Sequence, residues 1–405
     1  MKIGIYNEQP FHELGGAEYC MAVLAEALAP HHVVEVINHS PNLTVDHYCQ
    51  FSGRDLAGVR MRAVPIEDYP TEWLNCPWFP RARNRPRASR NLWQRYRDAR
   101  AWHRGLSEPY DLFVNFVHWM PPFCHARSGV LVVLFPIFRG IGFHMPNWYK
   151  PGVRGRLKRA YYKWEWRNRL NSYRRKLAIS SYSALWTKRW WDCDCDVVYP
   201  PVDTESRTRD KANVILSVGR FTADGPFFKK QKEMALTFQR LQQAGLPGWT
   251  YYCVGGLSDR DKDVDYFRDV NQLAGACGAR VLANVKRSDL LSLYAQAKIF
   301  WHAAGYGAGD DPAVNEHFGI VTVEAMAAGC VPIVIRKGAQ PEIVEHGVNG
   351  FLWNTLDELK DYTLRVIADE QLRARMSEAA RIRARFFSRE RFVERFLASV
   401  KAILR

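Results

Sequence analysis

The chain has 405 residues, of which 47% are apolar by type, enough for two or three domains with hydrophobic cores of their own. Its 57 Lys and Arg residues outnumber its 42 Asp and Glu residues, which gives a net charge of +15. The composition therefore excludes a small disulfide-stapled protein and a disordered chain, and the charge indicates an anionic partner.

The cysteines and the apolar runs indicate a reducing compartment without a membrane span. The nine Cys residues follow no disulfide or zinc spacing, and the Asp-Cys-Asp-Cys-Asp run at 192–196 is interpreted as an exposed turn. The amino terminus lacks the pattern of a signal peptide. The apolar run at 129–138 is shorter than the roughly 20 residues that cross a bilayer. We expect no metal and a cytoplasmic address.

The first half of the chain alternates short β-branched runs with helix-like stretches, which is typical of a parallel sheet covered by helices. Gly15 and Gly16 follow the first predicted strand and open a helix whose apolar residues share one face. The predicted strands lie at 3–6, 33–38, 112–117, 130–135 and 177–180. Residues 1–203 are therefore predicted to form one Rossmann-like domain.

A second series with the same rhythm follows the polar stretch at 204–213, which has the composition of a linker. Its predicted strands lie at 214–218, 250–254, 280–285, 298–302, 331–335 and 351–353. Residues 204–387 are predicted to form a second domain, and 388–405 a docking helix that can cross back to the first. The fold class is α/β, with two doubly wound Rossmann-like domains facing across a cleft.

The segment 315–329 carries the strongest signal for a binding site. It is predicted as a loop followed by a helix that begins near Gly319, so the amides of Phe318, Gly319, Ile320 and Val321 start the helix without partners. Free amides and the helix dipole form an anion site suited to a diphosphate. Glu316 and Glu324, eight positions apart, are expected to bracket a diphosphate bound there, one at a sugar and one at a ribose.

Two cations follow the first strand of the second domain. Arg220 lies at the end of that strand and Lys229 at the start of the next helix, so both are expected to project from the carboxyl edge of the sheet. Beside free helix amides, such cations are suited to clamp phosphate groups.

The motifs of this sequence, together with their order along the chain, resemble those of the family 4 retaining glycosyltransferases of GT-B fold. The resemblance rests on Glu-x7-Glu at 316–324, Gly219-Arg220 followed by Lys229, the Gly-Gly-Ala-Glu run at 15–18, and the runs at 198–203 and 338–344. It is greatest toward the branch of the dolichol-linked oligosaccharide mannosyltransferases and bacterial surface-polysaccharide transferases.

The resemblance implies roles for individual residues. Arg220 and Lys229 would hold the nucleotide diphosphate and stabilise the leaving group, with Lys230 as the alternative to Lys229. Glu316 would face the donor hexose or the reacting centre, and Glu324 the ribose hydroxyls. Residues that the resemblance places at the donor or the acceptor are His118, Gly15, Gly16, His317, Phe318, Gly319, Ile320 and Val321.

The resemblance also implies a reaction. A hexose would move with retention from a nucleotide diphosphate sugar to a glycan or lipid-linked glycan in surface polysaccharide or glycolipid synthesis, without a metal or other cofactor. GDP-mannose is favoured as donor over a UDP-hexose. Glu316 and Glu324 are too widely spaced for the roughly 5 Å geometry of hydrolases that use paired carboxylates.

Two segments of the first domain hold the excess charge. Residues 81–104 have nine Arg and one Asp, and residues 150–176 have eleven Lys or Arg and one Glu. Two nearly opposite aromatic and aliphatic stripes run along the second segment, so one can pack on the core while the other stays exposed. Basic residues interleaved with Trp favour an anionic membrane surface. We expect a peripheral protein on the inner face of the plasma membrane.

Three alternatives remain open from the sequence. One is a UDP-hexose-dependent transferase of the same family that acts on a soluble acceptor. The others are a non-catalytic binder of acidic glycan and a nucleic-acid binder, since basic aromatic patches also bind single strands. Nucleic acid is not expected, because the chain contains no recognised nucleic-acid module.

Overall fold

The computed structural model describes residues 1–7, 15–40, 42–64, 92–137, 152–205, 210–223, 228–246, 248–401 and 403. The chain divides into two compact units. The first unit comprises Met1–Ile179, Ser183–Val198 and Val393–Arg405, and the second comprises Ser180–Tyr182 and Tyr199–Phe392. The predicted segments at 81–91 and 150–151 lie outside the described residues.

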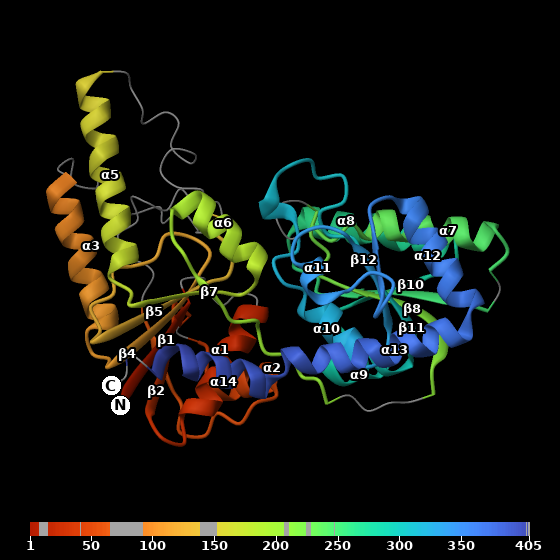
Figure 1. Ribbon diagram of the computed structural model, residues 1–405, viewed down its shortest axis with the longest axis horizontal. Coiled ribbons are helices and arrows are strands. Elements are labelled where there is room, and N and C mark those ends of the chain that lie inside the picture. The colour runs from red at the N-terminus through yellow and green to blue at the C-terminus, as the bar shows by residue number, and fades with distance from the viewer. Residues whose placement is uncertain are drawn as a thin grey trace. The chain divides into compact units, whose positions relative to one another are not determined.

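The first unit is built on a seven-stranded parallel sheet in the order β3-β2-β1-β4-β5-β6-β7 (Figure 1). Its strands are β1 (Lys2–Asn7), β2 (Val33–Asn38), β3 (Arg60–Ala63), β4 (Leu112–Val117), β5 (Ser128–Val133), β6 (Arg175–Ala178) and β7 (Asp196–Val197). The central strands β1, β4 and β5 are almost entirely buried, as expected for a sheet covered on both faces.

Helices cover both faces of this sheet. Helices α1 and α2 lie on one face, and α3 and α5 lie side by side on the other (Figure 1). The helices of the unit are α1 (Gly16–Leu28), α2 (Val45–Ser52), α3 (Leu92–Ser107), α5 (Val153–Asn171) and α6 (Ser181–Trp191), which begins in the short Ser180–Tyr182 segment of the second unit. In the described part of the chain, no helix is long and apolar enough to cross a membrane.

The second unit repeats the arrangement with a six-stranded parallel sheet in the order β10-β9-β8-β11-β12-β13. Its strands are β8 (Ala212–Val218), β9 (Thr250–Gly255), β10 (Arg280–Ala283), β11 (Ala297–His302), β12 (Val331–Ile335) and β13 (Phe351–Trp353). Each of these six strands overlaps a predicted one.

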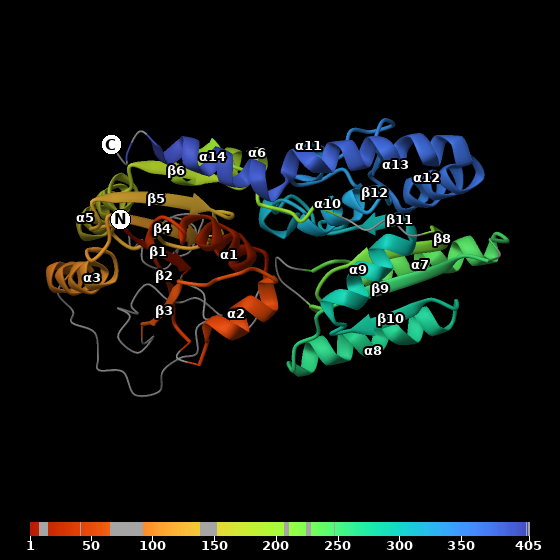
Figure 2. The same cartoon turned by 90° about the horizontal axis from the view of Figure 1, so that it is seen from below.

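The helices of the second unit also form two layers, with α7, α8 and α12 on one face and α9, α10 and α13 on the other (Figures 1 and 2). Its helices are α7 (Gln231–Gln243), α8 (Asp261–Gly275), α9 (Arg287–Gln296), α10 (Ile320–Ala327), α11 (Gln340–Ile343), α12 (Leu356–Ala368) and α13 (Glu370–Ala384). Two 3-10 turns, η4 (Pro312–Val314) and η5 (Arg385–Phe387), complete the unit.

Both sheets therefore have the strand order of a doubly wound Rossmann fold, in which the direction of winding reverses at one point. That point lies between β1 and β4 in the first unit and between β8 and β11 in the second. Ligands of such sheets bind at the carboxyl ends of the two strands that flank the reversal. These two edges are therefore where functional side chains are expected.

The last helix, α14 (Arg389–Lys401), begins in the second unit and ends in the first. Its apolar side chains Phe392, Phe396 and Val400 are buried. Near the chain end, the Ser128 hydroxyl donates to the Ile403 carbonyl over 3.0 Å, which ties this segment to β5. The carboxyl-terminal segment is thus part of the core of the first unit.

Candidate active site

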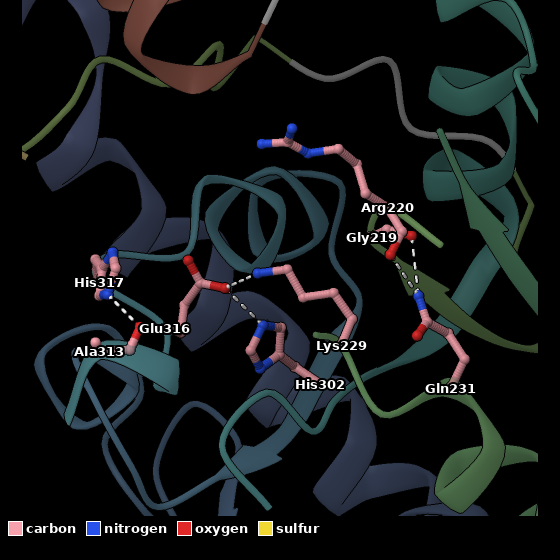
Figure 3. A network of polar contacts seen from close by, with 8 residues as sticks. All are labelled: Gly219, Arg220, Lys229, Gln231, His302, Ala313, Glu316 and His317. Atoms are coloured by element: carbon pink, nitrogen blue, oxygen red, sulfur yellow. Dashed lines mark hydrogen bonds and ion pairs between the residues drawn. The ribbon is translucent and has the colours of Figure 1, made fainter. Parts of the chain in front are cut away.

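The reversal point of the second unit brings together residues from separate parts of the chain. β8 ends at Val218 and leads into Gly219 and Arg220, while β11 ends at His302. The loop after β11 then carries Glu316 back toward the same edge (Figure 3). The site is thus built on strand ends, where the backbone is held by its neighbours in the sheet.

Glu316 is the centre of this site. Its Oε2 atom accepts a hydrogen bond from Lys229 Nζ at 2.7 Å and lies 3.0 Å from His302 Nε2. Its Oε1 atom makes no hydrogen bond to any described residue, and Figure 3 shows it pointing away from both partners. One carboxylate oxygen is therefore anchored and the other is open.

The surroundings of Glu316 keep it ionised. Burial raises the pKa of its carboxyl, but the Lys229 ammonium and the His302 hydrogen bond outweigh burial and hold that pKa well below its usual range. His302 itself is buried, and burial lowers its pKa despite the neighbouring carboxylate. Among the described residues, the negative charge of Glu316 is thus held by the Lys229 cation and by an imidazole whose neutral form is favoured.

Gly219 leaves the space through which the Lys229 side chain reaches Glu316. A Cβ atom on Gly219 would lie 2.7 Å from the Lys229 Cγ atom, so only glycine lets the lysine stem pass over this turn. Lys230 is directed elsewhere: it has a left-handed backbone at φ 61° and pairs with Glu233 at 3.5 Å. Of the two predicted lysines, the structure places Lys229 against Glu316.

Hydrogen bonds from a buried side chain hold the turn that carries Arg220. The buried Gln231 donates its Nε2–H to the carbonyls of Gly219 and Arg220, at 3.1 and 2.9 Å. Tyr266 in turn donates its hydroxyl to Gln231 Oε1 at 3.1 Å. The Arg220 side chain is exposed, and Figure 3 shows its guanidinium extended away from this turn.

The amino terminus of α10 has the features for which an anion site was predicted. Gly319, at φ 115°, precedes the helix, and the amides of residues 318–321 donate to no acceptor in the described part of the chain. Two buried side chains lie next to Gly319 with unsatisfied polar atoms, Gln340 and Thr322. Buried polar groups without partners are rare in proteins, so they indicate a polar occupant at this helix end.

The loop of Glu316 rests on the Gly338 turn. Gly338 has a left-handed backbone at φ 61°, and a side chain there would collide with the Glu316 backbone. The Ala339 amide donates to the Glu316 carbonyl over 2.9 Å. The motif at 338–344 therefore positions the site without contributing a side chain to Glu316.

Glu324 lies on α10, and its surroundings differ from those of Glu316. Its Oε1 accepts from Arg287, and its Oε2 accepts from the Tyr294 hydroxyl at 3.0 Å. Both partners lie on α9. The carboxylate predicted to bind ribose is therefore already held at both oxygens.

His317 and Phe318 face the interior of the unit. The His317 Nε2 atom lies 3.0 Å from the Ala313 carbonyl, and burial lowers the pKa of the imidazole to about 4. Phe318 is buried and its ring packs against Tyr199 and Phe387. Their backbones lie beside the start of α10.

The remaining predicted residues lie at the reversal point of the first unit. Gly15 caps α1, and its amide donates to Glu18 Oε2 over 2.8 Å, while the buried Asn7 at the end of β1 donates to Glu18 Oε1. Gly16 is the first residue of α1, and His118 follows the last residue of β4. The Glu18 contacts show that this glycine turn is anchored to the sheet.

No group of His, Cys, Asp and Glu side chains able to hold a metal ion occurs among the described residues. Two acidic residues of the run at 192–196 form ion pairs with Lys188 instead, Asp194 at 2.8 Å and Asp192 at 3.6 Å. Cys193 and Cys195 form no disulfide.

His302 is the residue of this site that the sequence did not single out. It ends a strand predicted at 298–302 and belongs to no recognisable motif. Its contact with Glu316 spans a glycine-rich loop, so no spacing rule links the two positions. A polar residue at the end of a strand beside the reversal point was the available signal.

Residues 202–383 match the family model described as glycosyl transferases group 1. The match covers most of the second unit, including Arg220, Lys229, Glu316 and Glu324.

Several curated relatives carry mannosyltransferase names, among them the following two. The GDP-Man:Man(3)GlcNAc(2)-PP-Dol alpha-1,2-mannosyltransferase of Dictyostelium discoideum is 27% identical over 234 residues, which cover 54% of this chain and 44% of that protein. The human alpha-1,3/1,6-mannosyltransferase ALG2 is 36% identical over 92 residues, which cover 22% of each. The chain thus matches less than half the length of these relatives.

A solved structure extends the similarity to the whole chain. The structure of Anabaena Alr3699/HepE in complex with UDP superposes with a TM-score of 0.67 at 17% identity, covering 99% of this chain and 100% of that one. This similarity shows the fold alone. With the two sheets described above, it confirms the predicted GT-B class of two Rossmann-like domains.

Proposed function

We propose that the chain is a retaining, metal-independent hexosyltransferase that moves mannose from GDP-mannose to a glycan or lipid-linked glycan in surface polysaccharide or glycolipid synthesis. One observation carries the proposal. A cation, a carboxylate with one open oxygen and a row of free helix amides meet at the carboxyl edge of one Rossmann sheet. This combination suits a ligand with an anionic diphosphate and a hydroxyl-rich sugar.

Each part of the site has a task in this reaction. The amides at residues 318–321, Lys229 and the exposed Arg220 bind the diphosphate and stabilise the charge that develops on it. Glu316 Oε1 accepts a hydrogen bond from a sugar hydroxyl, and Glu324 binds the ribose. These cations and dipoles supply the positive charge that a metal ion supplies in other transferases.

The proposed transfer needs no covalent intermediate between the sugar and the enzyme. The acceptor hydroxyl oxygen forms a bond to the anomeric carbon from the face of the leaving group, and the bond from that carbon to the β-phosphate oxygen breaks. The hydroxyl proton passes to the departing diphosphate, which leaves as GDP. The anomeric configuration is therefore retained.

The donor is chosen by relatedness rather than by a contact in the chain. The two curated relatives above are named as mannosyltransferases, and the first is named for GDP-Man. The solved structure with the same fold carries UDP. GDP-mannose is therefore the first choice, and a UDP-hexose is the second.

Thermal shift and product analysis test this function. The full chain is screened against GDP, UDP, GDP-mannose and UDP-glucose, with lipid-linked and soluble glycans as acceptors. We expect GDP and GDP-mannose to raise the melting temperature, and the new linkage to keep the α-configuration by NMR in the presence of EDTA. Stabilisation by no nucleotide, or an inverted linkage, would contradict the proposal.

A surface on α3 and α5 supports an acceptor at a membrane. The outer stripe of α5 includes Leu157, which is 65% exposed, and Trp164, while Trp93 of α3 is 61% exposed. Trp93 and Trp164 pack with their ring centres 6.1 Å apart, so the two helices share one aromatic surface. The opposite stripe of α5, including Tyr162 and Trp166, is buried in the core of the first unit.

The charge around this surface is almost entirely positive. Exposed basic side chains on the two helices are Arg97, Arg100, Arg104, Arg154, Arg156, Arg159, Lys163 and Arg167. The one acidic residue of α5, Glu165, is buried in an ion pair with Arg169 at 2.7 Å. Exposed Trp beside Arg and Lys is the composition of a surface that binds anionic lipid headgroups. This supports a peripheral position on the cytoplasmic face of the plasma membrane.

Flotation with vesicles tests this surface. We expect the full chain to float with vesicles of phosphatidylglycerol and phosphatidylcholine, and not with phosphatidylcholine alone, and added salt should weaken binding. The combined W93S, L157S and W164S variant should float less. L291S is the matched control, because Leu291 is 48% exposed on α9 of the second unit. Equal flotation of the two variants would exclude the surface.

A further inference from the structure

His302 is a buried imidazole with one committed nitrogen. It is 3% exposed, and its Nε2 atom lies 3.0 Å from Glu316 Oε2. Its Nδ1 atom is buried and has no hydrogen-bond partner among the described residues. The two nitrogens therefore have very different environments.

These environments decide where the proton lies. A protonated imidazole carries an N–H on both nitrogens, and the Nδ1–H would then be buried without an acceptor. A neutral imidazole with its proton on Nε2 leaves only a lone pair at Nδ1 and donates to the carboxylate. Burial, which lowers the His302 pKa, acts in the same direction.

Lys229 and His302 hold the same oxygen of Glu316 but differ in mobility. Lys229 is a flexible cation on the loop before α7, and a bound diphosphate would compete with Glu316 for its ammonium. His302 is fixed at the end of a central strand and carries no charge that a diphosphate attracts.

We propose that His302 is a positioning residue: its Nε2–H holds Glu316 Oε2 when the donor draws Lys229 away, so that Oε1 stays directed at the hexose. The proposal rests on the proposed function for the identity of the hexose. The contact itself, and the proton position that it requires, do not depend on that function.

In the described part of the chain, two side chains contact the Glu316 carboxylate. Lys229 reaches it from the loop before α7 and His302 from β11, while the neighbouring His317 is turned to the Ala313 carbonyl. When the His302 hydrogen bond is removed, the Lys229 ammonium still lowers the carboxyl pKa of Glu316, but burial raises that pKa with less opposition. The carboxyl pKa of Glu316 should therefore rise in H302F and stay near its original value in H302Q, whose amide can donate in the same direction.

NMR tests the contact without any assay of activity. In the full chain labelled with ¹⁵N at histidine, we expect His302 to be neutral at pH 7 with its proton on Nε2. In a ¹³C-carboxyl titration, with the Glu316 signal assigned by its absence in E316Q, H302F should titrate at higher pH than the unmodified chain. A charged ring, a proton on Nδ1 or an unchanged Glu316 titration would overturn the proposal.

Kinetics test the consequence. H302F should lower kcat about hundredfold, as expected when a reacting group loses its orientation, and H302Q should recover most of that loss. In the E316Q background, H302F should have no further effect, because the group that it positions is gone. S217A is the matched control, since it removes a buried hydrogen bond to Tyr251 at 2.7 Å on the neighbouring strand.

Different results would contradict the proposed function and the positioning role of His302. An unmodified chain that transfers no sugar overturns the proposed function. A chain that transfers sugar while H302F and E316Q act independently overturns the positioning role and leaves the function standing.

Discussion

Glu316 and Glu324 lie eight positions apart in one segment, yet their surroundings differ. Glu316 has one oxygen held by Lys229 and His302 and the other open, whereas Glu324 has both oxygens held by residues of α9. A carboxylate with an open oxygen can respond to a ligand, and one held twice mainly shapes its pocket. We therefore expect Glu316 to act in the chemical step and Glu324 in donor binding.

The largest effect is expected at the open carboxylate. E316Q keeps the shape of the side chain but removes its charge, so the transition state loses a charged partner and kcat should fall about a thousandfold. Initial rates at saturating donor measure this, with circular dichroism as the check on folding. If E316Q keeps more than a tenth of the activity, Glu316 is not the reactive member of the pair.

The two lysines provide a matched pair. K229M removes the cation against Glu316 and should lower kcat/KM about hundredfold, since a charge-assisted contact at the diphosphate is lost. K230M removes the contacts of Lys230 with Glu233 and with the Phe228 ring, neither of which involves Glu316, and should change kcat/KM less than about threefold. A larger loss in K230M than in K229M would reverse the assignment.

Glu324 should behave as a binding residue. E324Q weakens one charge-assisted contact, so KM for the donor should rise about tenfold while kcat stays within about threefold of the original. Steady-state kinetics with varied donor separate the two parameters. A loss confined to kcat would show that Glu324 acts in the chemical step, and its difference from Glu316 would disappear.

The smallest effect is expected at the turn below Lys229. G219A adds a Cβ atom 2.7 Å from the Lys229 Cγ, which pushes the lysine from Glu316 and should lower kcat about fivefold. G275A is its control, because a Cβ at Gly275 has no atom within 4 Å. If both variants retain full activity, the lysine reaches Glu316 by another path.

The sequence predicted the sheets well, because buried parallel strands are continuous apolar runs. All six strands of the second unit overlap their predicted ranges. β3 was missed because Arg60–Ala63 contains two arginines and lies at the edge of its sheet, where burial does not select apolar residues. β7 has two residues, too few for any pattern.

The site was predicted in part, for reasons of geometry. Glu316 and the amides of α10 lie within one short segment, so spacing alone relates them. His302 and Lys229 reach Glu316 across loops of unknown path, and the turn at Lys230 decides which lysine points inward. On α5, periodicity shows two apolar stripes, but only packing against the core shows which of them is exposed.

The path of α14 has a practical consequence. The chain crosses between the units at the short Ser180–Tyr182 segment, passes to the second unit at Tyr199 and returns at Val393, so more than one covalent connection joins the units. A single protease cut between them therefore releases neither unit. A shortened chain that ends where the family match ends, at residue 383, would remove Phe396 and Val400 from the first unit and expose the core that they cover. The two units of this fold cannot be separated by trimming one end.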